Sequence, residues 1–297
     1  MKTQANILII GATGKVGGMA LNYLVENTNH NVIAAVRKKE QASAFDTLGV
    51  QSVYLDLDDV SSIRQGLKDI NRVLLLTAYS VDMLKQSMRV IDEAKSAGVK
   101  HIVHVGASGN PTAEVAHWGW HRMIEAYIEK QGFSFTHLQP EAFMQNITAF
   151  GWLSQSSLTN LIGNSVWSWV DANDVGAFAG AVLAKPEIYS GQTWRLGYAR
   201  ASMQKVARMI SSSVLQDIKV HEQNPDNFYQ IAIENGADPA YMSCVRDQFK
   251  LNSKNAIEHA DMIFDEHAFE QTVGYKPTSW PAFIERELGG LKAATAA

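Results

Sequence analysis

Two histidines of the stretch AHWGWHRMIEAYIEKQG, His117 and His121, are four residues apart near the start of a segment with a helical pattern. Side chains at positions i and i+4 share one face of a helix, so the pair could bind a metal ion or take part in proton transfer. A zinc site needs at least one further ligand and usually a glutamate directly after the first histidine. Trp118 takes that place, and Cys244 is the only cysteine of the chain. The sequence therefore predicts no metal at this pair.

A glycine-rich turn, GATGKVGG at residues 11–18, follows a short apolar run at residues 7–10. The G-x-x-G-x-x-G spacing at a strand-to-helix junction allows a tight turn, close approach of the backbone to a pyrophosphate and close packing of helix on strand. The N-terminus of the following helix would supply unpaired N–H groups for the phosphates. A P-loop is excluded because the four-residue insert is missing and Val16 stands where a magnesium-binding Ser or Thr would be. The predicted dinucleotide-binding residues of this turn are Gly11, Thr13, Gly14, Lys15, Val16 and Gly17.

Basic residues follow the second expected strand, where the sequence reads Val36-Arg37-Lys38. A carboxylate at this point would bind the adenosine ribose of NAD, whereas an arginine suits the 2′-phosphate of NADP, which it can pair bidentately. We therefore predict that Arg37 and Lys38 bind the cofactor and that NADPH is preferred. Glu40 lies nearby, and NADH stays possible.

Short apolar runs alternate with segments of helical periodicity over the first half of the chain. This alternation indicates βαβ units with right-handed crossovers, and nearly all-apolar strands are typical of a parallel sheet covered by helices on both faces. The sequence predicts an α/β protein with a doubly wound parallel Rossmann sheet. The expected strands are residues 6–10, 31–36, 51–55, 72–77, 101–105 and 133–138, and the expected helices are residues 16–27, 40–48, 60–68 and 83–97.

The alternation of apolar runs and helical segments ends near residue 150. Residues 151–169 are rich in Gly, Ser, Asn and Trp, which indicates loops or a ribbon. Further helices are expected at residues 172–184, 202–214, 227–235 and 281–288. We predict two domains, an NAD(P)-binding Rossmann domain at residues 1–150 and a smaller lobe at residues 151–297. The second would mainly bind substrate, with some segments returning to the Rossmann sheet.

Ligands of a doubly wound sheet bind at the carboxyl ends of its strands. Ser108 lies just past the fifth expected strand, where it could orient a substrate oxygen or simply form a turn. Residues at the ends of the fourth and sixth strands should line the cofactor channel. They are Thr77, Ala78, Pro140, Ala142 and Phe143.

The helix that carries the two histidines should border the nicotinamide half of this channel. The imidazole of His121 could hydrogen-bond the nicotinamide ribose or donate a proton near neutral pH, so His121 and Ser108 are the predicted catalytic residues. For His117, packing or capping of the helix start is the alternative.

Five of the seven tryptophans lie between residues 118 and 169. Aromatic side chains could stack on a flat acceptor, or they could close the seam between the sheet and the second lobe. Both interpretations stay open, and each could hold for different tryptophans of the five. The predicted substrate-pocket residues are Trp118, Trp120, Phe143, Trp152, Trp167 and Trp169.

Composition and charge limit the partners and the cellular location expected for the protein. The 297 residues carry a formal net charge of −4, which gives no reason to expect a nucleic-acid partner. The single cysteine fits a reducing cytoplasm. The N-terminal apolar run is too short for a secretion signal, and the longest later one, residues 175–184, is too short to span a bilayer. We expect a cytoplasmic protein without a membrane partner.

These motifs together resemble the NmrA-like group of atypical short-chain dehydrogenases/reductases. The matching stretches are GATGKVGG, Val36-Arg37, Asp56-Leu57, VKHIV at residues 99–103, Gly106-Ala107-Ser108, FMQN at residues 143–146, DANDV at residues 171–175 and the region 269–283. The resemblance covers nearly the whole chain. It implies a Rossmann fold and NAD(P) binding, with Asp56 and Leu57 at the adenine and Gly106 and Ala107 also at the cofactor.

One departure from ordinary short-chain dehydrogenases concerns the proton donor. Those enzymes use Tyr-x-x-x-Lys, but none of the nine tyrosines here has lysine four residues later. Loss of this tyrosine is typical of the NmrA-like reductases, in which a Lys or His occupies the corresponding helix, and that position resembles His121.

The resemblance implies a flavin-independent, metal-independent NAD(P)H reductase of a conjugated aromatic acceptor, such as a quinone, an azo dye or a triarylmethane dye. Such acceptors take hydride into a delocalised system, so that a strong general acid is less necessary. The alternatives are an NAD(P)-sensing regulator of the NmrA type without turnover and a biosynthetic imine or enone reductase. A monomer or homodimer is expected from the family.

Overall fold

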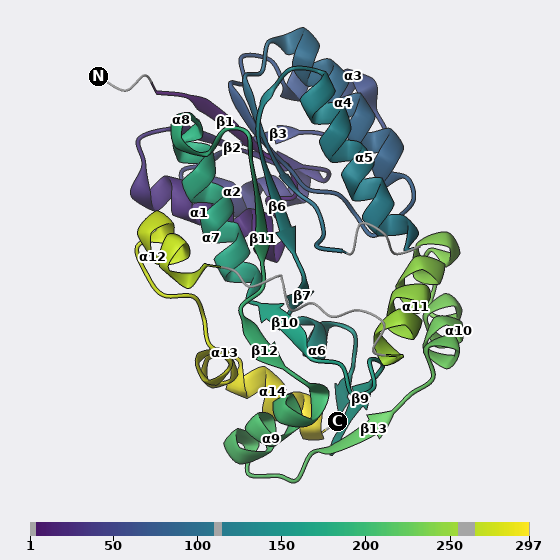
Figure 1. The fold of residues 1–297 in the computed structure, drawn as a ribbon. Helices are drawn as coiled ribbons and strands as arrows, with labels where there is room; N and C mark the ends of the chain where they lie inside the picture. The colour runs from purple at the N-terminus through teal and green to yellow at the C-terminus, as the bar shows by residue number, and fades with distance from the viewer. Residues whose placement is uncertain (1–3, 110–114, 255–264, 297) are drawn as a thin grey trace.

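The computed structural model describes residues 4–109, 115–254 and 265–296. Its main element is a seven-stranded sheet in the order β11-β6-β5-β4-β1-β2-β3, and every neighbouring pair is parallel (Figure 1). The strands are β1 (Asn6–Ile9), β2 (Asn31–Val36), β3 (Gln51–Tyr54), β4 (Arg72–Leu75), β5 (His101–Val105), β6 (Ser134–Pro140) and β11 (Gln192–Leu196). The strand order reverses between β1 and β4, which confirms the predicted doubly wound Rossmann fold.

Helices cover both faces of this sheet, and the alternation of side chains along β1 shows the two cores. Ile7 and Ile9 belong to the cluster under α1 (Lys15–Asn27) and α7 (Ala172–Ala184), whereas Leu8 belongs to the cluster on the opposite face. The helices of that opposite face are α3 (Val60–Gly66), α4 (Met83–Ala97) and α5 (Ala116–Lys130). Two-sided burial explains why the strands read as nearly continuous apolar runs.

The six expected strands are all present, but the seventh, β11, was not predicted. β11 lies at the edge of the sheet, pairs with β6 from Gln192↔Thr136 to Leu196↔Pro140, and alternates half-buried with exposed residues. Its sequence QTWRL therefore lacks the apolar run of a central strand. The expected helix at residues 40–48 is divided into a 3₁₀ turn, η1 (Lys39–Gln41), and the short α2 (Ala42–Asp46).

Parts of the chain after β6 build a second lobe around two small sheets. One contains β7 (Ala142–Phe143), β10 (Trp167–Val170) and β12 (Ala199–Ala201), and the other contains β8 (Leu153–Ser154), β9 (Ser157–Asn160) and β13 (Lys219–Glu222). The remaining helices are α6 (Asn146–Ala149), α8 (Pro186–Tyr189), α9 (Met203–Val214), α10 (Pro225–Glu234), α11 (Pro239–Ser253), α12 (Glu266–Val273), α13 (Trp280–Arg286) and α14 (Leu288–Ala296). The boundary between two domains near residue 150 stays a prediction.

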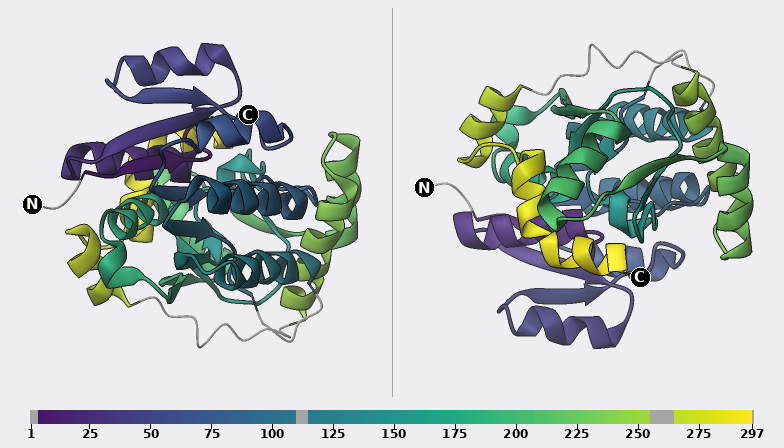
Figure 2. Two further views of the ribbon diagram at one scale, coloured as in Figure 1. Left: turned by 90° about the horizontal axis from the view of Figure 1, so that it is seen from above. Right: turned by 90° about the horizontal axis from the view of Figure 1, so that it is seen from below.

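Helices α10 and α11 form an arm that reaches from this lobe back to the Rossmann half (Figures 1 and 2). Tyr241 of α11 is buried in the apolar cluster of the α3–α5 face, so the arm packs against α5. Asp238 caps α11 by accepting hydrogen bonds from the N–H groups of Ala240 and Tyr241. This cap fixes where Tyr241 lies and typically contributes about 1 kcal/mol to helix stability.

Among the residues that the structure describes, no helix has the length and apolar character needed to cross a membrane.

Candidate functional site

The glycine-rich turn has the features that a dinucleotide phosphate requires. Gly11 has φ +78°, and a Cβ at Gly17 would overlap the carbonyl group of Gly11, so both positions need glycine. Helix α1 begins at Lys15, and within the described residues no side chain caps its N-terminus. The first N–H groups of α1 are therefore available to an anion, and the exposed residues Thr13, Gly14 and Lys15 surround them.

The ends of β2 and β3 lie beside this turn because β1, β2 and β3 are neighbours in the sheet. Arg37 and Lys38 are exposed, and their backbone N–H groups both donate to the side-chain oxygen of Gln41, at 3.2 and 3.1 Å. Asp56 and Leu57 are partly buried at the end of β3. The residues predicted to bind the adenosine half of the cofactor therefore lie together at the carboxyl ends of β1, β2 and β3. This arrangement fits a dinucleotide.

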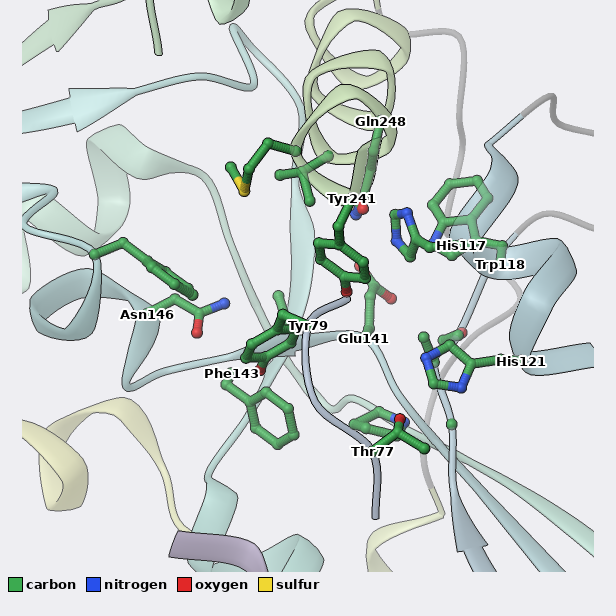
Figure 3. A pocket seen from close by; sticks show the side chains of 18 of the residues that line it. Thr77, Tyr79, His117, Trp118, His121, Glu141, Phe143, Asn146, Tyr241 and Gln248 are labelled. Atoms are coloured by element: carbon green, nitrogen blue, oxygen red, sulfur yellow. The ribbon is translucent and has the colours of Figure 1, made fainter. Parts of the chain in front are cut away.

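A cavity of about 480 Å³ opens at the carboxyl ends of β4, β5 and β6, between the sheet and the second lobe (Figure 3). Its size is typical of a small-molecule site. From the Rossmann half as far as β7 of the lobe, the lining comprises Val16, Leu76, Thr77, Ala78, Tyr79, Val105, Gly106, Ala107, Ser108, His117, Trp118, His121, Pro140, Glu141, Ala142 and Phe143. The lobe side comprises Asn146, Phe150, Trp152, Trp167, Phe228, Ala237, Asp238, Tyr241, Met242, Val245, Gln248 and Phe249.

Both predicted catalytic residues and all five residues predicted to line the channel at the strand ends lie in the wall of this cavity. Ser108 is buried, and its backbone N–H donates to the carbonyl of Pro140 at 2.8 Å, which ties the segment after β5 to the end of β6. The roles of these residues stay predictions.

Two of the expected pocket tryptophans lie elsewhere. Trp169 is fully buried in the core of the lobe, where it packs on Trp167 and Trp280 and its indole N–H donates to the carbonyl of Ala201. Trp120 is half-buried on α5, with its ring centroid 6.3 Å from that of Tyr241. Trp167 and Trp169 lie on the same face of β10, so only their different depths in the lobe separate them, and rotation along α5 turns Trp120 away from the cavity. Neither property can be set without knowing the packing partners.

His117 and His121 both face the cavity from α5 (Figure 3). Burial lowers the pKa of His121 to about 3, with a smaller contribution from His117, and burial lowers the pKa of His117 to about 4 against the opposing effect of a hydrogen bond with Gln248. Both imidazoles are therefore neutral near pH 7. A neutral His121 can hydrogen-bond a ligand, but it is a weak source of protons.

Glu141 was missed by the sequence reasoning, although it stands between two residues expected beside the nicotinamide. Its carboxylate accepts a hydrogen bond from the N–H of Ser168 at 3.0 Å, and its own N–H donates to the carbonyl of Leu196. Burial raises the pKa of Glu141 to about 8, and the Ser168 hydrogen bond and the charge of Arg200 only partly oppose this rise. Glu141 therefore holds a proton near pH 7 inside the cavity. Its place at a strand end was the signal that could have identified it.

Aromatic rings from both halves meet over the cavity. The ring centroid of Tyr79, from the segment after β4, lies 5.6 Å from that of Tyr241 of α11 and 6.4 Å from that of Phe150. Phe249, also from α11, packs on Trp152 and Trp167. The helix α11 that supplies two of these rings was not predicted, although Asp238-Pro239 is a typical helix start.

This sheet with its glycine turn defines a Rossmann-type α/β protein with a ligand cavity at the strand ends. The chain belongs to the NmrA-like family, whose model matches residues 3–285. An NAD(P)H azoreductase of Xenophilus azovorans is 28% identical over 183 residues, which are 61% of this chain and 64% of that protein. The chain thus matches less than two-thirds of that relative's length.

Two solved structures share the fold over nearly their whole length. An NADPH-dependent quinone oxidoreductase of Escherichia coli, complexed with NADPH, has a TM-score of 0.81 at 18% identity, covering 95% of this chain and 99% of that one. A triphenylmethane reductase of Citrobacter sp., complexed with NADP(H), has a TM-score of 0.80 at 19% identity with the same coverage, 95% and 99%. At these identities the likeness establishes the fold.

Proposed function

We propose that this protein is a reductase that uses NADPH to transfer hydride to a flat, conjugated acceptor such as a quinone, an azo dye or a triarylmethane dye. The observation that carries the proposal is the aromatic cavity at the carboxyl edge of the sheet, in line with the glycine turn and strand ends that fit a dinucleotide. The names of the relatives support it, since the azoreductase and both solved reductases act with NAD(P)H or hold NADP(H).

Each part of the chain has a separate task in this proposal. The turn at residues 11–17 and the basic end of β2 bind the phosphates, and Thr77, Ala78 and residues 140–143 position the nicotinamide. Bound NADPH supplies the hydride. The aromatic rings hold the acceptor flat and exclude water, so that proximity and orientation lower the barrier.

Glu141 is the proposed proton donor. Reduction of a quinone or an azo group adds a proton as well as a hydride, and Glu141 is protonated near pH 7 in the same cavity. Its carboxyl would give the proton to the reduced acceptor and regain one from solvent. His121 and Ser108 would orient the acceptor or the ribose as hydrogen-bonding groups.

Several finer properties remain part of the proposal. Arg37 supports NADPH over NADH. A flavin-free, metal-free hydride transfer, a cytoplasmic location, a monomeric or homodimeric state and no nucleic-acid or membrane partner are predictions from the sequence and the family.

The test is purified protein with NADPH or NADH and a panel of quinones, azo dyes, triarylmethane dyes, imines and enones, followed by loss of reduced-nicotinamide absorbance. We expect turnover with the first three classes and a preference for NADPH. Turnover with imines or enones alone would contradict the proposed quinone and dye acceptors and favour a biosynthetic imine or enone reductase. Tight dinucleotide binding without turnover across the panel would contradict the reductase and favour a cofactor-sensing regulator.

A further inference from the structure

Three buried polar side chains meet behind the cavity, between the sheet and α5. His104 of β5 and His137 of β6 are direct partners across two parallel strands, and both point toward the face that α5 covers. Glu125 of α5 completes the group. One donor atom from each of the three residues lies within 4.8 Å of the other two, and Nδ1 of His104 is 4.0 Å from Oε1 of Glu125.

These imidazoles are unusual for a protein interior. His104 is 0% and His137 is 1% exposed, and within the described residues neither ring nitrogen of either histidine has a hydrogen-bond partner. Buried polar atoms in folded proteins nearly always have a partner, from protein, water or an ion. Two buried imidazoles without hydrogen-bond partners beside the carboxylate of Glu125 therefore call for a ligand.

Neighbouring groups are placed as the outer shell of a metal site would be. The side-chain amide of Gln139 donates to both carboxylate oxygens of Glu125, at 3.0 Å each, and thereby fixes the plane of that carboxylate. The half-exposed carboxylate of Glu129 lies 3.4 Å from Nε2 of His137. A carboxylate that accepts the N–H of a metal-bound imidazole is a common outer-shell partner, and it leaves the other nitrogen for the metal.

We propose that His104, His137 and Glu125 bind a divalent transition-metal ion, with Zn²⁺ the preferred one. Two imidazoles and one carboxylate form a common zinc donor set, completed by water or a further ligand. Zinc–ligand bonds of about 2.0–2.2 Å place donors roughly 3.3 Å apart, so donor atoms that now lie within 4.8 Å of one another need to close by up to about 1.5 Å.

This site differs from the His117–His121 pair, for which the sequence predicts no metal. Its members are separated by 21 and 12 positions along the chain, so no local motif marks them. A metal here would fasten α5 to β5 and β6. His121 lies one helical turn before Glu125, with its ring 5.5 Å from that of His104, and would be held at the cavity wall.

The test is metal binding by the full chain, prepared without a histidine tag and stripped with a chelator. Equilibrium dialysis with Zn²⁺ and the visible absorption of Co²⁺ should show one ion per chain. His104→Gln and His137→Gln should each weaken binding by more than about 100-fold, and Gln139→Leu by roughly 10- to 100-fold. The exposed histidines His221 and His267 provide the controls, and His221→Gln and His267→Gln should leave binding unchanged.

Circular dichroism and dinucleotide binding establish that each variant is folded. If a ligand variant does not fold, X-ray absorption at the zinc edge of the unmodified chain should still show imidazole nitrogen and carboxylate oxygen around the ion. The proposal is overturned if the unmodified chain binds no Zn²⁺ or Co²⁺ saturably, or if binding depends on His221 or His267 instead. No readout uses turnover, so failure of the reductase proposal and failure of this one are distinguishable.

Discussion

The dinucleotide edge and the substrate cavity lie side by side but are built in opposite ways. The edge at residues 11–17 presents the exposed residues 13–15 and works through backbone N–H groups and the absence of side chains. The cavity is lined by side chains from segments as far apart as Val16 and Phe249. A backbone site depends on a few glycines in one short turn, whereas a side-chain site depends on how distant elements pack. Substitutions that change packing should therefore act abruptly at the glycines of the turn and by degrees among the aromatic rings of the cavity.

The largest effect is expected at Gly17. Gly17→Val places carbon atoms where the carbonyl group of Gly11 lies, so the turn must open and the N-terminus of α1 must shift. We expect measurable NADPH binding, followed by nicotinamide fluorescence, to disappear, and turnover with it. Gly119→Ala is the matched control, because a Cβ on Gly119 would meet no neighbouring atom within 4 Å and alanine favours a helix by up to about 1 kcal/mol. Normal binding by Gly17→Val would mean that this turn is not the phosphate site.

The second prediction concerns the proton in the cavity. Glu141→Gln keeps the shape of the side chain but removes the acid, so turnover with quinones and azo dyes should fall by about 100-fold or more while NADPH affinity is unchanged. The pKa of Glu141 is raised to about 8, so its protonated form, and the activity that needs it, should be lost as the pH rises through about 8. The glutamine variant should lack this decline. An identical pH profile in both proteins would remove Glu141 from proton transfer.

This contrast also explains how much the sequence could predict. The turn and six of the seven strands were predictable because glycine spacing and apolar runs are local properties of the chain. The edge strand β11 and the helix α11 were not predicted, so Tyr241 and Phe249 were missing from the expected pocket. Trp169 was expected in the pocket but lies in the core of the lobe, and only the packing around β10 shows this. Chemical roles at the site stay predictions for the same reason.

A smaller effect is expected where a side chain assists the backbone edge. Arg37→Ser removes a group that would pair with the 2′-phosphate, so affinity for NADPH should fall by roughly 10- to 100-fold while affinity for NADH stays the same. Titrations with both cofactors measure the ratio. Arg208→Ser, at an exposed position on α9, serves as the control for loss of one positive charge. Equal losses for NADPH and NADH would show that Arg37 does not read the 2′-phosphate.

The smallest effect is expected at Tyr79, where the two halves of the molecule meet. Its ring contacts Tyr241 and Phe150, and aromatic pairs of this kind contribute about 0.5–1.5 kcal/mol beyond buried area. Tyr79→Leu should therefore raise the KM for a dye by roughly 2- to 10-fold and leave kcat and NADPH affinity nearly unchanged, since several other rings still line the cavity. Tyr54→Leu tests loss of an exposed tyrosine outside the cavity and should change neither constant. An abrupt loss of activity in Tyr79→Leu alone would contradict the graded behaviour expected of the cavity, because it would make one ring as decisive as a glycine of the turn.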